Sequence, residues 1–201
     1  MIKAVFFDLG NVLMPVDGYR LARKLAGYTP LSPNKILGVL RKELIIRGFE
    51  MGKVGPREWY KKICDGCRLK DLSYPNFVRF FNDIFTLDIQ VAGLLRRLKN
   101  QYKLGLISNT NQLHTSHLMR KYKFFRDFDR MWLSHQIGIR KPDRRIYELA
   151  LSHFSVPAEQ SVFIDDVEKN VQGATRVGMK GIHFKGFKPL TRKLRKLGVQ
   201  I

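Results

Sequence analysis

Four short motifs carry the residues that could do chemistry, and each follows or interrupts an apolar run. An aspartate lies in FFDLGNVL, a serine in LISNTN, a lysine in RKPD, and two adjacent aspartates in FIDDVEKN. These residues are Asp8, Ser108, Lys141, Asp165 and Asp166. In an open parallel sheet, ligands bind at the carboxyl ends of the strands. Together the motifs therefore predict a site for an anion and a divalent cation.

The three aspartates indicate the cation. Asp8 follows an apolar run, where burying a carboxylate is costly unless it meets a cation or hydrogen-bond donors. Asp165 and Asp166 are neighbours at the end of another such run, and a hard cation relieves the repulsion between them. Because Mg²⁺ prefers oxygen ligands of this kind, the pattern predicts a magnesium site.

The serine and the lysine indicate the anion. The hydroxyl of Ser108, together with backbone N–H groups such as that of Asn109, can hold a phosphoryl oxygen at the start of a helix. Lys141 can offset the negative charge of a phosphoryl group during its transfer. Its neighbour Arg140 is expected to face solvent or the rim of the substrate site.

Five apolar runs predict the strands that would position these residues, because buried parallel strands read as continuous apolar stretches. They cover residues 4–7, 103–107, 131–134, 161–164 and 181–184. Helical spacing of apolar residues lies between them. Strands that alternate with helices predict an α/β fold with a parallel sheet.

Helices are predicted over residues 89–100 and 170–177, the second capped by Gly178. Pro142 is expected in the first turn of another helix. The apolar face of this helix would hold Ile146, Leu149, Ala150 and Phe154. The basic tail that contains Leu190, Leu194 and Leu197 is expected to be an amphipathic helix on the core or a loose tail.

The stretch from residue 15 to residue 88 breaks this alternation. It has no clear buried strand, its apolar residues recur at helical spacing, and Gly and Pro punctuate it. We expect four or five helices that form a small bundle inserted after the first strand.

In this order the four motifs resemble those of the haloacid dehalogenase superfamily, whose members are mostly Mg²⁺-dependent phosphatases. The resemblance implies a Rossmann-like parallel sheet flanked by helices (residues 1–14 and 89–201) with an inserted helical cap (residues 15–88). Asp8 would be the catalytic nucleophile that forms an aspartyl-phosphate, and Lys141 would assist it. The metal would be held by Asp8, the carbonyl of Gly10 and Asp166, with Asp165 bound directly or through water.

Gly10 departs from the superfamily pattern. Most of its phosphatases have a second aspartate there, which protonates the leaving oxygen and then activates water. Glycine keeps the carbonyl but removes the acid, which leaves a weaker phosphatase, a phosphatase with a displaced acid, or a binding protein with an inactive site. Asp17 is the nearest acid that could replace the missing one and is therefore a candidate catalytic residue.

A finer resemblance concerns the substrate. The variants DLGN, SNTNQLHT and RKPDRRIY are similar to those of the bacterial α-D-glucose-1-phosphate phosphatase group, which implies a small sugar phosphate as substrate. The alternatives are a phosphatase of the phosphoglycolate or nucleotide type, or a catalytically impaired basic binding protein on the same scaffold.

The chain is strongly basic, with a formal charge of +20 over 201 residues. A positive field attracts phosphorylated substrates and also nucleic acid, but no recognition module for nucleic acid is visible. We therefore expect a small phosphorylated partner, with nonspecific nucleic-acid binding possible but not favoured. No apolar run approaches a membrane span and Asp8 comes too early for a secretory signal, so a cytoplasmic protein is expected. Cys64 and Cys67 are expected to be two reduced thiols.

Overall fold

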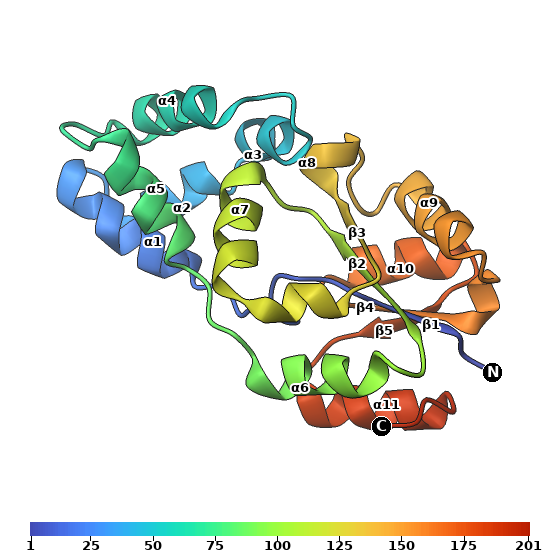
Figure 1. Cartoon of the computed structure of the whole chain (residues 1–201). Helices are drawn as coiled ribbons and strands as arrows, with labels where there is room; N and C mark the ends of the chain where they lie inside the picture. Colours follow the sequence, from blue (N-terminus) through green and yellow to red (C-terminus); the bar gives the residue numbers. More distant parts are fainter.

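An open sheet of five parallel strands forms the centre of the protein, seen here in a computed structural model that describes residues 1–43 and 46–201 (Figure 1). The strands are β1 (Ala4–Phe7), β2 (Lys103–Ser108), β3 (Arg130–Leu133), β4 (Ser161–Asp165) and β5 (Lys180–His183). Their order across the sheet is β3-β2-β1-β4-β5, and every neighbouring pair is parallel. Each predicted strand is present to within one residue at either end, which confirms the α/β fold.

Helices cover both faces of this sheet. One face packs against α6 (Ile89–Leu98), α7 (Gln112–Lys121) and α11 (Phe187–Lys196), and the other against α9 (Arg144–Phe154) and α10 (Glu168–Arg176). The tail is therefore a helix on the core, since Leu190 and Leu194 are buried there. The short helix α8 (Ser134–Ile137) follows β3, and brief 3-10 turns occupy Ala26–Tyr28, Lys123–Asp127 and Ala158–Gln160.

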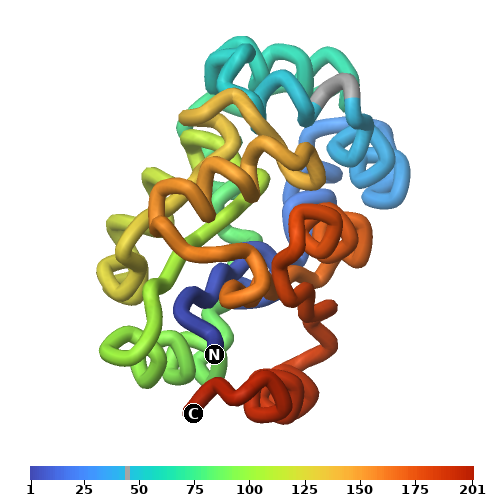
Figure 2. The backbone as a smooth tube through the Cα atoms, turned by 90° about the vertical axis from the view of Figure 1, so that its right-hand side faces the viewer, coloured from blue at the N-terminus to red at the C-terminus, as the bar shows by residue number. Residues whose placement is uncertain are grey.

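Between β1 and α6 the described chain forms five α-helices at one end of the sheet (Figures 1 and 2). They are α1 (Gly18–Leu25), α2 (Pro33–Leu40), α3 (Glu43–Glu50), α4 (Pro56–Cys67) and α5 (Tyr74–Asn82). We call them the helical segment. It has a hydrophobic cluster of its own around Trp59, whose ring stacks on Phe49 at 4.5 Å and lies 4.6 Å from the ring of Phe81.

Two short stretches of chain join the helical segment to the sheet, and they lie side by side. The amide of Asp17 donates to the carbonyl of Ile84 at 2.8 Å, and the amide of Thr86 donates to the carbonyl of Pro15 at 3.0 Å. This pairing brings the entrance and the exit of the segment together next to the carboxyl end of β1.

Two local expectations are wrong. Pro142 lies before Asp143, the N-cap of α9, so it is outside the helix whose first turn it was expected to occupy. Leu149 is 42% exposed, whereas the other three members of its predicted apolar face are buried. The described residues include no helix that is both long enough and apolar enough to cross a membrane.

Candidate active site

The sheet order brings the motifs to one edge. β1 lies between β2 and β4, and Phe7 is paired with Leu106 on one side and Ile164 on the other. Asp8 therefore follows the central strand, while Ser108 and Asp165 end its two neighbours. The three strands that carry these residues therefore lie side by side in the sheet.

Lys141 lies at the centre of the cluster. Its Nζ is 2.7 Å from Asp8 Oδ1 and 2.6 Å from Asp165 Oδ2, and its side chain is 1% exposed. A buried ammonium is stable only when opposite charges surround it. Two carboxylates meet that condition, and they fix the position of the ammonium between two strand ends.

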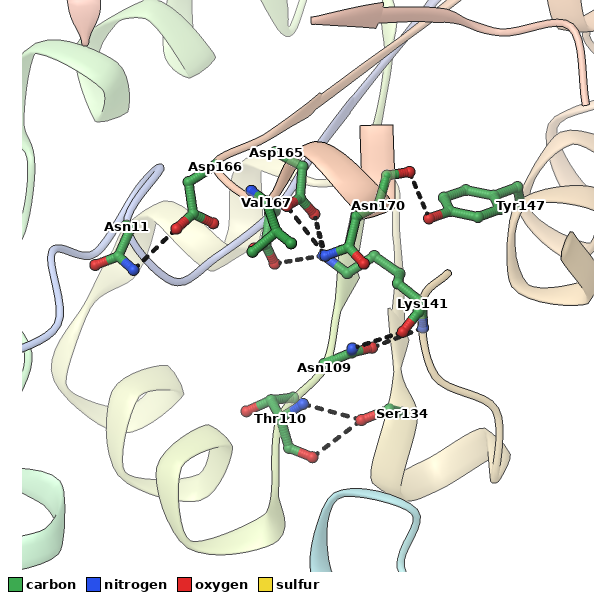
Figure 3. A network of polar contacts seen from close by, with 11 residues as sticks. Asn11, Asn109, Thr110, Ser134, Lys141, Tyr147, Asp165, Asp166, Val167 and Asn170 are labelled. Atoms are coloured by element: carbon green, nitrogen blue, oxygen red, sulfur yellow. Dashed lines mark hydrogen bonds and ion pairs between the residues drawn. The ribbon is translucent and has the colours of Figure 1, made fainter. Parts of the chain in front are cut away.

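The two adjacent aspartates have different surroundings (Figure 3). Besides Lys141, the fully buried carboxylate of Asp165 accepts hydrogen bonds from the amide of Val167 at 2.8 Å and from the Asn170 side chain at 3.1 Å. Both of its oxygens are thus engaged. Asp166 accepts one side-chain hydrogen bond, from Asn11 at 3.0 Å, and is partly exposed.

The three aspartates form a set of oxygen donors. One carboxylate oxygen from each of Asp8, Asp165 and Asp166 lies within 4.8 Å of the other two. A ligand set made of carboxylate oxygens alone suits a hard divalent cation such as Mg²⁺. The residues present therefore fit the predicted metal.

Burial and charge oppose each other at Asp8. Burial raises its pKa and Lys141 lowers it, and burial prevails, bringing the pKa to about 7. Burial acts to lower the pKa of Lys141, but the carboxylates of Asp8 and Asp165 outweigh it and the pKa is raised. The ammonium of Lys141 is therefore the permanent charge of the cluster, and further positive charge near Asp8 would favour its ionised form.

Asn109 orients the loop that carries Lys141. Its side chain donates to the carbonyl of Lys141 at 3.0 Å and accepts from the amide of Lys141 at 2.8 Å. A second link between the same parts of the chain joins the amide of Thr110 to the hydroxyl of Ser134 at 2.9 Å. Ser108 is 2% exposed at the end of β2. The sequence predicted a role only for the backbone N–H of Asn109. Its side-chain contacts with Lys141 depend on how the fold brings the two residues together, and they were not predicted.

Asp17 is not brought into the cluster. It is the N-cap of α1: its side chain accepts from the amide of Arg20 at 2.9 Å, and it lies 3.6 Å from the guanidinium of Arg23. The expectation for Arg140 is wrong in part, since its guanidinium is 18% exposed and forms ion pairs with Glu43 and Glu50 of α3. These pairs join the helical segment to the loop that carries Lys141.

Two side chains near the cluster were not predicted as site residues. Asn11 adopts a left-handed backbone conformation with φ of 53°, and it links Asp166 to the amide of Val16 through its two side-chain ends. His114 stacks on Phe81 at 3.9 Å, and burial lowers its pKa to about 3, so it is neutral near pH 7. For Asn11, the only signal in the sequence was an asparagine shortly after Asp8, because asparagine adopts the left-handed conformation of a tight turn more readily than most residues.

Curated relatives are similar over most of the chain. A sesquiterpene phosphatase, astK of Aspergillus oryzae, is 27% identical over 97% of this chain and 96% of its own length. A D-ribitol-5-phosphate phosphatase of Bacteroides thetaiotaomicron is 25% identical over 90% of each chain. The drimenol cyclase drtB of Aspergillus calidoustus is 30% identical over 92% of this chain, which spans only 34% of that protein.

A solved structure shares the fold. A haloacid dehalogenase family enzyme of Bacteroides thetaiotaomicron, in complex with magnesium and inorganic phosphate, superposes with a TM-score of 0.78. It is 24% identical, and the match covers 92% of this chain and 95% of that chain. Residues 2–178 match the haloacid dehalogenase-like hydrolase family. The chain belongs to that family of hydrolases.

Proposed function

We propose that this chain is a Mg²⁺-dependent phosphatase that hydrolyses small phosphomonoesters through an aspartyl-phosphate on Asp8. The observation that carries the proposal is the buried Lys141 ammonium, 2.7 Å from Asp8 and 2.6 Å from Asp165. Such an ammonium orients a nucleophilic carboxylate and supplies positive charge for an incoming phosphoryl group. The relatives named as phosphatases, and the solved structure with magnesium and phosphate, support the same chemistry.

The reaction would proceed in two steps. An oxygen of Asp8 bonds to phosphorus while the bond from phosphorus to the alcohol oxygen breaks. The departing oxygen takes a proton from water, because Gly10 has no acidic side chain. Water then attacks the phosphorus of the aspartyl-phosphate, which releases inorganic phosphate and restores the Asp8 carboxylate. We assign the phosphoryl oxygens to Lys141, the Ser108 hydroxyl and the backbone N–H of Asn109.

We assign the metal to Asp8, Asp166 and the carbonyl of Gly10. When bound, Mg²⁺ supplies positive charge that keeps Asp8 ionised and offsets the charge of the phosphoryl group. Asp165 would contact it only through water, because its two oxygens already accept hydrogen bonds from Lys141, Val167 and Asn170. Its role would be to position Lys141.

We also propose that residues 15–88 act as a cap, while residues 1–14 and 89–201 form the catalytic core. Support comes from the separate hydrophobic cluster of the helical segment. It also comes from the two linkers, which are held together by backbone hydrogen bonds between Pro15 and Thr86 and between Asp17 and Ile84. A cap in this position would shape the space around the carbon part of the substrate.

The relatives differ in that carbon part. One is named for a polyol phosphate and another for a sesquiterpene, so phosphate hydrolysis is their shared property. Among sugar phosphates, α-D-glucose 1-phosphate remains the one that the sequence motifs favour, and its less basic anomeric oxygen suits a site without a general acid.

The proposal is tested by the variant Asp8→Asn with 4-nitrophenyl phosphate and Mg²⁺. We expect turnover to be lost while the protein stays folded, because the two side chains have nearly the same shape and Asp165 still pairs with Lys141. Brief incubation of the wild type with ³²P-labelled substrate should label the protein in an acid-stable, hydroxylamine-sensitive form. EDTA should abolish release of phosphate, and added Mg²⁺ should restore it.

Asp17→Asn is the matched control, because asparagine keeps the N-cap of α1 and Asp17 lies outside the cluster. Its turnover should equal that of the wild type. Full activity of Asp8→Asn, or of the wild type in EDTA, would contradict the covalent, metal-dependent mechanism. A selective loss for poor leaving groups in Asp17→Asn would identify Asp17 as the displaced acid.

A further inference from the structure

A cavity of about 340 Å³ lies between the helical segment and the carboxyl edge of the sheet. At one end it is lined by Gly10, Asn11, Ser108 and Asn109, which adjoin Asp8 and Lys141 in the chain or in space. A substrate with its phosphoryl group at Asp8 would therefore place its carbon part in this cavity. Its volume is at the lower end of the range for small-molecule sites.

The wall opposite the sheet is apolar, and every helix of the helical segment contributes to it. Each of the five supplies at least one large apolar side chain: Leu21 from α1, Leu37 from α2, Ile46 from α3, Trp59 from α4 and Phe81 from α5. Leu37 and Ile46 are partly exposed, whereas Leu21, Trp59 and Phe81 are almost fully buried. Such a surface stabilises apolar groups in proportion to the area that they remove from water.

Polar groups on this wall are few. Arg41, Glu50 and the indole N–H of Trp59 are its polar groups, and of these Glu50 is ion-paired with Arg140 at 2.8 Å, whereas the Trp59 N–H has no hydrogen-bond partner among the described residues. His114, on the sheet side, is engaged by the side chain of Asn82 at 3.1 Å. A sugar or polyol carries several hydroxyl groups, and each one buried without a partner costs about 1–3 kcal/mol. Among the described residues of this wall, the side chains of Arg41 and Trp59 are left to pair with them, two groups for the several hydroxyls of a sugar.

We infer that the substrate is a phosphomonoester whose carbon part is an apolar chain or ring system that lies against the helical segment. This inference rests on the proposed phosphatase activity at Asp8 and names its substrate class. The basic depression on the other side of Asn109, lined by Arg47, Arg140 and Lys141, would remain the polar side of the site.

The test is a series of 4-alkylphenyl phosphates from methyl to octyl, assayed with the full chain and Mg²⁺. The leaving phenol has nearly the same basicity throughout the series, so the absent acid at Gly10 affects all members equally. We expect kcat/KM to rise about threefold to fourfold per methylene until the cavity is full, and then to level off. Glucose 1-phosphate should be slower than the longer alkylphenyl phosphates.

The variant Gly18→Leu links this effect to the cavity. A Cβ at Gly18 would lie 3.5 Å from Leu37 Cδ1, so a leucine there would fill part of the space. It should lower kcat/KM for the longest members about tenfold or more relative to phenyl phosphate. Gly38→Leu makes the same change on α2, where a Cβ meets nothing within 4 Å, and should behave like the wild type.

The inference and the proposed function can fail separately. If turnover of the alkylphenyl phosphates does not depend on alkyl length and sugar phosphates are hydrolysed faster, the inference is overturned and the proposed phosphatase activity still stands. If no substrate is hydrolysed, calorimetry with 4-alkylbenzylphosphonates, which cannot be hydrolysed, still decides. Affinity that rises with alkyl length and falls in Gly18→Leu would support the apolar site, and flat affinity would contradict it.

Discussion

Lys141 divides the roles of three neighbouring carboxylates. It contacts Asp8 and Asp165 but not Asp166, and the remaining hydrogen bonds of Asp165 come from Val167 and Asn170. Asp165 is therefore fully engaged by protein donors, whereas Asp8 and Asp166 keep oxygen lone pairs for other ligands. Two adjacent aspartates in a sequence look equivalent, and only their surroundings distinguish Asp165, for which we propose a positioning role, from Asp166, which we propose as a metal ligand.

Gly10 gives the prediction at this scale. A Cβ at Gly10 would lie 3.7 Å from Val16 Cγ2, an ordinary contact, so an aspartate can be introduced. We expect Gly10→Asp to supply the missing proton and to raise kcat/KM for glucose 6-phosphate relative to 4-nitrophenyl phosphate. The gain should be on the order of 10²–10⁴-fold, since a nitrophenolate leaves well without a proton.

Gly10→Asn is the matched control, because it has the same size and no acidic proton. Its ratio of rates for the two substrates should stay close to that of the wild type. An equal change in both variants would show that bulk at this position, and not proton transfer, alters the reaction.

At the scale of the elements, the strands were predictable and several contacts were not. Continuous apolar runs located all five strands because both faces of a parallel sheet are covered by helices. Asp8, Ser108 and Asp165 follow from those strand ends. The start of α9 was missed because Asp143 takes the N-cap position, where its side chain accepts from the amide of Arg145. The ion pairs of Arg140 were missed because its loop and α3 lie far apart in the sequence. The cavity wall likewise requires the packing of all five helices.

The two ion pairs of Arg140 give the prediction for the elements. Glu50 is 15% exposed and Glu43 is 61% exposed, and burial raises the pKa of Glu50. In a double-mutant cycle with Arg140→Met, we expect a coupling free energy of about 1–3 kcal/mol for Glu50→Gln. For Glu43→Gln we expect about 0.2–1 kcal/mol, because exposed pairs are screened by water.

Urea unfolding of the wild type, the three single variants and the two double variants measures both couplings. Glu43→Gln is the internal control, because it removes a charge that is paired with the same guanidinium from the same helix. Equal couplings would mean that burial does not strengthen the contact between α3 and the Lys141 loop.

At the scale of the whole molecule, the charge is the feature that the site does not explain. The sequence has 37 Lys and Arg residues against 17 Asp and Glu residues, and part of this excess lies on α11. That helix buries Leu190 and Leu194 in the core and exposes Lys188, Arg192, Lys193, Arg195 and Lys196. Its basic residues therefore face away from the protein and are free to attract polyanions.

We expect this surface to bind nucleic acid weakly and without regard to sequence. Each phosphate that a basic side chain neutralises releases counterions, so affinity should fall steeply, by about 10³–10⁵-fold between 50 and 200 mM salt for six to ten contacts. Fluorescence anisotropy with labelled RNA and DNA of several sequences measures this. Replacing Arg192, Arg195 and Lys196 by glutamine should lower the salt dependence while phosphatase activity, remote from α11, stays unchanged. Tight, sequence-selective binding that persists at 200 mM salt would instead favour a nucleic-acid-binding protein built on a hydrolase fold.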